Sequence, residues 1–184
     1  MNELYAKCIP FDANVKGRIG GNPPQIVENS IPDGYLFYAT LEHPEKENIM
    51  LSIFIHGDFH TLLYNNIYPS VAVKVIEHEY SEISSNTKNA LVDLEMQSIS
   101  AYMETFDKDD FLFIKAGGEP RFIQHKNFYY KELEDDNYSF YLMIDEEGYN
   151  DELLKGSYVF NFGALYLYKH NITGEIIAGF WQYS

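Results

Sequence analysis

Apolar residues in this chain are concentrated in short runs, separated by polar stretches that contain most of the glycines and prolines. Short runs rich in β-branched and aromatic residues predict strands rather than helices. The predicted strands are Tyr35–Leu41, Ile49–Ile55, Phe59–Tyr64, Val71–Ile76, Phe111–Ile114, Ser139–Ile144, Tyr158–Lys169 and Ile176–Tyr183. We expect the last of these runs to close the sheet at the C-terminus.

Two adjacent runs predict a hairpin. Gly57 and Asp58 separate Ile49–Ile55 from Phe59–Tyr64, and a glycine in the first central place suits a two-residue turn.

The same sequence device occurs twice, as Gly20-Gly21-Asn22-Pro23 and as Gly117-Gly118-Glu119-Pro120. Paired glycines adopt backbone angles that are closed to other residues, and the following proline fixes φ. Each Gly-Gly-x-Pro corner leads, after a polar stretch, to two apolar runs. The sequence therefore predicts a duplicated β-rich unit. Its two copies form two related halves, at about residues 16–83 and 111–184.

One segment, at about residues 86–106, has helical periodicity. Its apolar residues recur at four- and three-residue steps and predict one amphipathic helix packed on the sheet, bridging the two halves. They are Val92, Met96, Ile99, Met103 and Phe106. The predicted fold class is therefore α+β, predominantly antiparallel sheet, with residues 1–184 in a single domain.

Composition supports a folded, acidic protein. Its 184 residues are 46% hydrophobic, which is enough to bury a substantial core. A net charge of -15 disfavours nucleic acid and anionic membranes, because both present negative phosphates. It favours a basic protein as partner.

Cysteine content and hydropathy predict a cytoplasmic location. Cys8 is the only cysteine, so no internal disulfide can form, and it is expected to be a buried thiol rather than a nucleophile. Neither a signal peptide nor an apolar run of about 20 residues is found.

An acidic stretch from Glu132 to Glu152 contains no lysine or arginine. We expect it to form the surface that docks a basic partner. The carboxylates assigned to this surface are Glu134, Asp135, Asp136, Glu146 and Glu147.

Two stretches resemble metal sites, and both have a simpler interpretation. His56, Asp58 and His60 stand at steps of two, but the predicted hairpin would separate them. The loop Asp145–Glu152 is rich in carboxylates, but Asn150 stands where a calcium-binding EF-hand needs glycine. The glycine pairs match no phosphate-binding motif. The sequence thus predicts no metal, no cofactor and no catalytic residue.

The two corners, the Pro-x-Phe-Ile-Gln continuation at 120–124, the run Tyr141–Asp145 and the closing Phe180–Tyr183 resemble the YwqG-like family of bacterial proteins of uncharacterised function. This resemblance is best over Ile114–Tyr183. It implies a duplicated β-rich fold. It also favours an immunity-type protein, which would inhibit a toxin.

Two functions stay open at this point. The first is a non-enzymatic binding protein, such as an immunity-type protein, that binds its basic partner through the acidic surface. The second is a small-molecule binder, for example of carbohydrate, or a hydrolase with a pocket between the two halves. The residues assigned to that pocket are Gly20, Gly21, Pro23, Gly117, Gly118, Pro120, Gln124, Asp145, Trp181 and Gln182.

Overall fold

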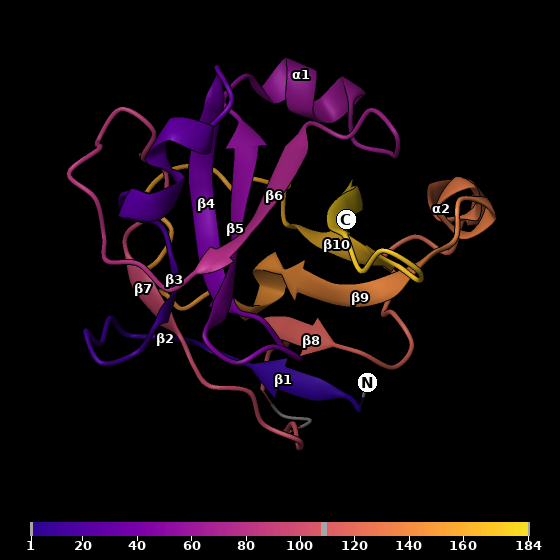
Figure 1. Cartoon of the computed structure of the whole chain (residues 1–184), viewed down its shortest axis with the longest axis horizontal. Helices are drawn as coiled ribbons and strands as arrows, with labels where there is room; N and C mark the ends of the chain where they lie inside the picture. The colour runs from indigo at the N-terminus through magenta and orange to yellow at the C-terminus, as the bar shows by residue number, and fades with distance from the viewer. Residues whose placement is uncertain (1, 108–109, 184) are drawn as a thin grey trace.

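Two antiparallel β-sheets pack face to face, with their strands crossing at a steep angle (Figure 1). The computed structural model describes residues 2–107 and 110–183. Every pairing between the named strands is antiparallel, so the predicted β-rich, antiparallel fold is confirmed.

The six-stranded sheet has the order β2-β7-β3-β4-β5-β6. Its bounds are β2 Cys8–Ile9, β3 Gly17–Ile19, β4 Tyr35–Glu42, β5 Ile49–His56, β6 Val73–Glu79 and β7 Gln97–Ile99.

The five-stranded sheet has the order β1-β8-β9-β10-β11. Its bounds are β1 Leu4–Ala6, β8 Ile114–Ala116, β9 Tyr138–Asp145, β10 Gly163–His170 and β11 Ile176–Tyr183. The C-terminal run is therefore an edge strand of this sheet, as predicted.

Helices are short. The two α-helices are α1 Phe59–Tyr64 and α2 Lys131–Asp135, and the 3-10 helices are η1 Gln25–Ser30, η2 Asn127–Tyr129 and η3 Glu146–Gly148. No helix in the described part of the chain is long and apolar enough to cross a membrane.

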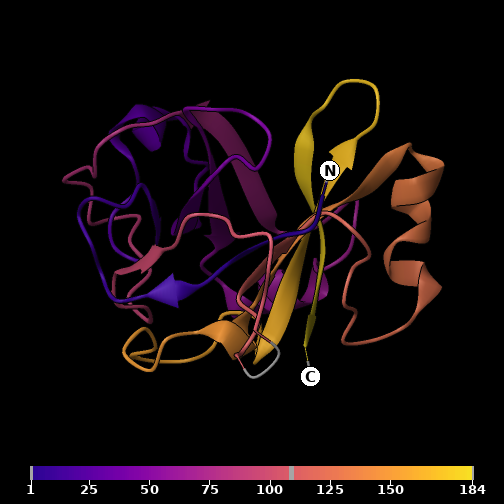
Figure 2. The same ribbon diagram turned by 90° about the horizontal axis from the view of Figure 1, so that it is seen from below.

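The main core lies between the sheets. It contains Tyr38 and Ile53 from the six-stranded sheet, and Leu142, Leu165 and Trp181 from the five-stranded sheet. Smaller apolar clusters cover the two outer faces, one beside η1 and one beside α2. In Figure 2, α2 lies on the side of the five-stranded sheet that faces away from the six-stranded sheet.

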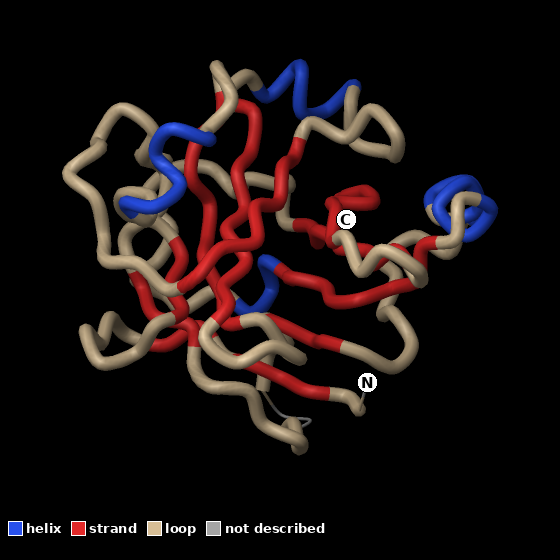
Figure 3. The backbone as a smooth tube through the Cα atoms, in the orientation of Figure 1, coloured by secondary structure: helices blue, strands red, loops and turns tan. Residues whose placement is uncertain are grey.

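The helix predicted at about residues 86–106 is wrong. Figure 3 draws this stretch as loop and short strand. Its backbone forms isolated turns and bonds to distant segments: Glu95 N–H donates to the carbonyl of Leu153, and β7 pairs with both β2 and β3. Val92, which the helix would have buried, is 81% exposed. Pairing within the sheet has overridden the local helical periodicity.

The hairpin predicted at Gly57-Asp58 is also wrong. The Asp58 carboxylate accepts a hydrogen bond from the His60 N–H at 2.9 Å and caps α1, so Phe59–Tyr64 is helical. The strand predicted at Tyr158–Lys169 begins only at Gly163, because Asn161 and Phe162 adopt positive φ angles of 56° and 58°.

Candidate functional site

The two Gly-Gly-x-Pro corners follow equivalent short strands. Gly20 and Gly21 have φ angles of 71° and 74°, and Gly117 and Gly118 have 73° and 62°. A Cβ at Gly20 would lie 2.3 Å from the carbonyl oxygen of Glu95, so a larger residue would be excluded there on space as well as on φ. The first glycine of each pair donates its N–H to a tyrosine carbonyl of the next strand in the sheet. Both corners therefore have the left-handed backbone that the sequence predicts.

Around the first corner, Gly21 lines a shallow groove and Pro23 is buried, with its carbonyl accepting from the Ser84 N–H at 2.9 Å. The second corner lines a different groove through Gly118 and Pro120. The two corners thus do not meet in one pocket.

The remaining predicted pocket residues divide between the two faces of the five-stranded sheet. Asp145 and Gln182 both pair with Ala164 in register, so they share the outer face. Gln124 joins them: its N–H donates to the Gln182 side-chain oxygen at 3.0 Å, and the Gln182 amide donates back to the Gln124 carbonyl at 2.9 Å.

Trp181 lies on the opposite face, fully buried between the sheets, where its indole N–H donates to the carbonyl of Leu62 at 3.1 Å. Gln182 is also fully buried, and its amide is occupied by Gln124. The single pocket predicted from Gln124, Asp145, Trp181 and Gln182 is therefore wrong. These residues tie a loop and α1 to the sheet.

The predicted acidic surface is divided in a similar way. Glu134, Asp135 and Asp136 are exposed on and just after α2, whereas Glu146 is only 1% exposed. Glu147 is half-buried and pairs with Arg121 at 3.2 Å. Strand β9 separates the two groups by eight residues, or about 25 Å at ~3.3 Å per residue.

Glu146 does not belong to the surface because its carboxylate has a structural role. It accepts hydrogen bonds from the N–H groups of Phe160 and Gly163, each at 3.0 Å, and from the Tyr149 hydroxyl at 3.1 Å. Burial raises the pKa of the Glu146 carboxyl, and these backbone hydrogen bonds offset part of the increase.

The metal candidates are not assembled. His56 Nδ1 accepts from the Asp58 N–H at 3.1 Å, and the Asp58 carboxylate is occupied by the helix cap. In the Asp145–Glu152 loop, Asp145 accepts from the Glu147 N–H at 3.0 Å. Across residues 2–107 and 110–183, no group of three or more His, Cys, Asp and Glu side chains is arranged to hold a metal ion.

A groove of about 390 Å³ lies between the second corner and α2, and we call it the corner–helix groove. Half of its lining residues are aromatic: Phe122 and Tyr130 stack with centroids 5.2 Å apart and planes 6° apart, and Phe140 meets Tyr168 edge to face. It is lined by Gly118, Glu119, Pro120, Phe122, Tyr130, Glu134, Tyr138, Ser139, Phe140 and Tyr168.

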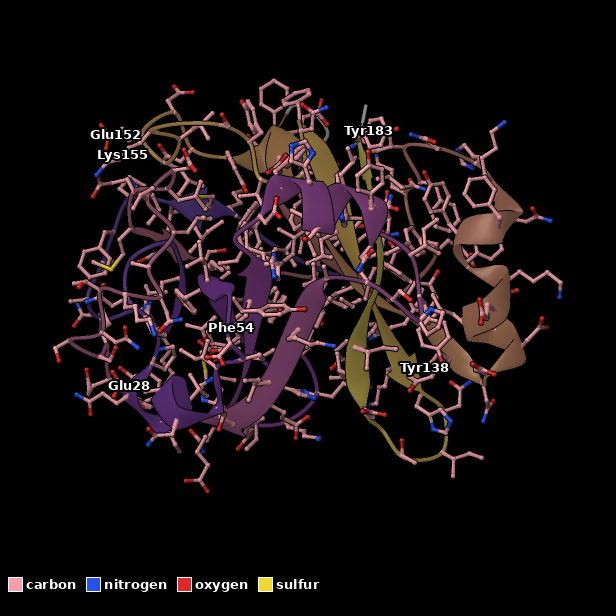
Figure 4. All side chains as sticks on the ribbon, turned by 90° about the horizontal axis from the view of Figure 1, so that it is seen from above. Glu28, Phe54, Tyr138, Glu152, Lys155 and Tyr183 are labelled. Atoms are coloured by element: carbon pink, nitrogen blue, oxygen red, sulfur yellow. The ribbon has the colours of Figure 1, made fainter. Side chains whose placement is uncertain are left out.

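Two exposed carboxylates, Glu119 and Glu134, lie on this groove. Neither forms an ion pair within the described part of the chain. The Glu134 charge acts on the groove, because it adds to the effect of burial in raising the pKa of Tyr168. Tyr138, labelled in Figure 4, lines the groove and packs edge to face against His170 of β10, with ring centroids 4.9 Å apart.

A second cavity of about 420 Å³, here called the seam cleft, lies where the two halves meet. One wall comes from the end of β5 and from α1, and the other comes from residues 157–161. Its polar groups are His56, Asp93, Ser157 and Asn161. Asp93 shapes this wall by accepting from the Ser157 N–H at 3.2 Å.

Sequence reasoning missed both cavities in part. It found Gly118, Pro120 and Glu134 but not the aromatic wall, because Phe122 and Tyr130 meet only when the loop folds back over the sheet. Of the seam cleft it named only His56, as a candidate metal ligand. Asn161, a wall residue with a positive φ, lies between Phe160 and Gly163, whose N–H groups both donate to the distant Glu146 carboxylate.

Comparison with known proteins returns no match to the chain among protein-family models, curated proteins or solved structures. The resemblance to the YwqG-like family therefore stays a prediction.

Proposed function

We propose that this chain is a non-enzymatic binding protein that takes a cationic side chain of a basic partner protein into the corner–helix groove. The observation that carries the proposal is the coincidence, in one groove, of stacked aromatic rings with the carboxylates of Glu119 and Glu134, which form no ion pair in the described part of the chain.

The chemistry of the groove fits a lysine or arginine. A cation over an aromatic face is stabilised by about 0.5–2 kcal/mol, depending on how far it is desolvated. A nearby carboxylate adds a Coulomb attraction that weakens as salt is added. The surrounding acidic residues of α2 and a net charge of -15 would speed the approach of a basic partner.

Fluorescence anisotropy with labelled hexa-arginine and hexa-lysine peptides tests this proposal. We expect binding at 50 mM NaCl that weakens strongly at 500 mM, and a loss of roughly five- to tenfold in affinity for the double variant E119Q/E134Q. That loss corresponds to about 0.5–0.7 kcal/mol for each charge, as expected for partly exposed pairs.

The matched control is D151N/E152Q, which removes the same charge from an exposed loop. Glu152 lies on the side of the molecule away from α2, as Figure 4 shows. Equal losses in the two double variants would mean that net charge alone attracts the peptide, and would refute the groove. Phe122→Leu, which keeps an apolar side chain but removes the ring, should weaken hexa-arginine binding further.

We also propose that the two sheets arose by internal duplication. Each contains a short strand ending in a glycine pair, followed by three antiparallel strands in sequence order: β3-β4-β5-β6 and β8-β9-β10-β11. In each, the first glycine donates to a tyrosine carbonyl, Tyr38 in one half and Tyr141 in the other.

Membership of the YwqG-like family, an immunity-type role and a cytoplasmic location are extensions of the same proposal. Identifying the proteins that co-purify from native cells would test them.

A second function is favoured by the seam cleft. Its volume of about 420 Å³, the rings of Phe59 and Tyr158, and four polar side chains suit a small polar molecule such as a sugar. A thermal-shift screen with mono- and disaccharides should then show a stabilising ligand. Ser157→Trp, which fills the cleft from an exposed position, should abolish the shift. An unchanged shift in this variant would place the ligand elsewhere.

A further inference from the structure

We propose that Arg18 and Thr40 bind a small inorganic anion, of the size of chloride, on the outer face of the six-stranded sheet. The site is separate from the corner–helix groove and does not depend on the proposed function.

The two residues are neighbours in the sheet. Arg18 of β3 pairs in register with Thr40 of β4 on one side and with Ser98 of β7 on the other, and Thr40 pairs with Ser52 of β5. Paired residues project on the same face, so these four polar side chains form one row. All are buried: Arg18 and Thr40 are each 4% exposed, and the two serines are fully enclosed.

Two of the four side chains are satisfied. Ser52 Oγ lies 2.7 Å from His78 Nε2, and Ser98 Oγ accepts from the Asp12 N–H at 2.9 Å. The other two are not: Arg18 Nη2 and Thr40 Oγ1 have no hydrogen-bond partner among the described residues. Unsatisfied buried polar atoms are rare and costly, and two on directly paired residues indicate a shared acceptor.

The rest of the guanidinium is held firmly. Arg18 Nη1 donates to the carbonyl of Gly20 at 3.1 Å, and the guanidinium carbon lies 4.6 Å from the centroid of the Phe37 ring. The Arg18 group is therefore fixed, with Nη2 left over to donate to a ligand.

No carboxylate in the described part of the chain forms an ion pair with Arg18. The other half shows a different arrangement. Lys115, which like Arg18 stands two residues before its glycine pair, has its ammonium 2.9 Å from the Glu3 carboxylate. Burial lowers the pKa of Arg18 to about 10, so the guanidinium still carries its charge at neutral pH. Burying an unpaired charge is strongly unfavourable, and an anion would remove that cost.

The size and approach of the ligand follow from the surroundings. Because both groups are more than nine-tenths buried, we expect the ligand to be no larger than a small ion. The guanidinium interacts electrostatically with Tyr80, which is 42% exposed, and the Lys16 ammonium lies 5.7 Å from the centroid of the Tyr80 ring. This border with solvent carries both signs of charge, because the Tyr80 hydroxyl also donates to the Glu82 carboxylate at 3.4 Å, and Lys16 supplies the positive side on which an anion can approach.

Bromide provides the direct test. Crystals soaked in sodium bromide should show an anomalous peak within hydrogen-bond distance of Arg18 Nη2 and Thr40 Oγ1. The same peak should be missing from crystals of Thr40→Val, which keeps the side-chain shape and removes the hydroxyl. A water molecule at that position, with no anomalous signal, would overturn the proposal.

Thermal unfolding supplies the solution test. At a constant ionic strength of about 200 mM, replacing sodium gluconate by sodium chloride should raise Tm by a few degrees, as expected for an ion that binds only the folded state. Arg18→Met and Thr40→Val should each lose this chloride-specific increase. Lys115→Met, the matched control, should keep it because Lys115 has its own carboxylate partner.

An equal chloride effect in Arg18→Met, Thr40→Val and Lys115→Met would refute the site. Arg18→Met should also be at least as stable as the native chain in gluconate, since it removes an unpaired buried charge. If Arg18→Met does not fold, Thr40→Val decides the question, because it changes a single hydroxyl.

Discussion

At the residue scale, Glu146 shows how one buried carboxylate can shape a loop. Its carboxylate accepts hydrogen bonds from the N–H groups of Phe160 and Gly163. It also accepts from the Tyr149 hydroxyl, which in turn lies 2.8 Å from the Tyr38 hydroxyl. The loop that it holds includes Asn161, a wall residue of the seam cleft. Glu146 is therefore a structural residue behind a cavity.

Its pKa leads to a pH prediction. Burial raises the folded-state pKa of Glu146 above that of the unfolded chain, so the native state binds more protons between the two values. The Glu146 contribution to the free energy of unfolding should therefore decrease as pH rises from about 4.3, the unfolded pKa, through the higher folded pKa. Urea unfolding between pH 4 and 8 should show this decrease in the native chain and a smaller one in Glu146→Gln.

The control is Glu152→Gln, at an exposed loop position, which should keep the native pH dependence. Identical pH profiles for the native chain and Glu146→Gln would contradict the prediction. The lowered pKa values of Glu95 and Asp58 act in the opposite direction at lower pH, and they are common to all three proteins.

At the element scale, the segment 86–106 shows the limit of periodicity. Its apolar spacing fits a helix, but its residues 97–99 fill the place between β2 and β3 and complete the six-stranded sheet. Leu94, in the same segment, is 4% exposed and bridges to Leu154. The segment therefore buries its apolar residues through contacts with several distant strands and loops instead of along one helical face.

This arrangement can be tested by substituting two apolar residues of the segment that differ in burial. Val92→Ala should change the free energy of unfolding by less than about 0.5 kcal/mol, because Val92 is 81% exposed. Leu94→Ala should cost about 2–4 kcal/mol, because Leu94 is buried. A loss for Val92→Ala as large as that for Leu94→Ala in urea unfolding would contradict this arrangement.

At the scale of the whole molecule, the two sheets share one core. Residues of both sheets meet in the same buried cluster, and Trp181 of β11 bonds to the carbonyl of Leu62 in α1, which follows β5 of the other sheet. Neither half can lose its structure without exposing the apolar face of the other. The two sheets are therefore expected to unfold as one unit.

The prediction is a single cooperative unfolding transition. Fluorescence of Trp181, which is buried between the sheets, and far-UV circular dichroism of all strands should give the same urea midpoint and slope. A fluorescence transition that precedes the loss of circular dichroism would show that the sheets separate before they unfold.

The local features of this protein follow from its sequence. Strands β4, β5, β9 and β11 lie within one residue of their predicted bounds, and the glycine pairs have the predicted positive φ angles. Side chains alternate along a strand, and glycine has unusual backbone freedom. Both properties depend on residues that are close in sequence, so a short stretch of sequence is enough to predict them.

The positions of the candidate sites follow from the three-dimensional packing. The conformation of 86–106, the burial of Glu146, the separation of Trp181 from Gln182 and the unpaired Arg18 all depend on partners distant in the chain. A sequence shows which residues can be buried or charged. Which atoms are left without a partner depends on long-range packing, and those atoms carry the proposed sites.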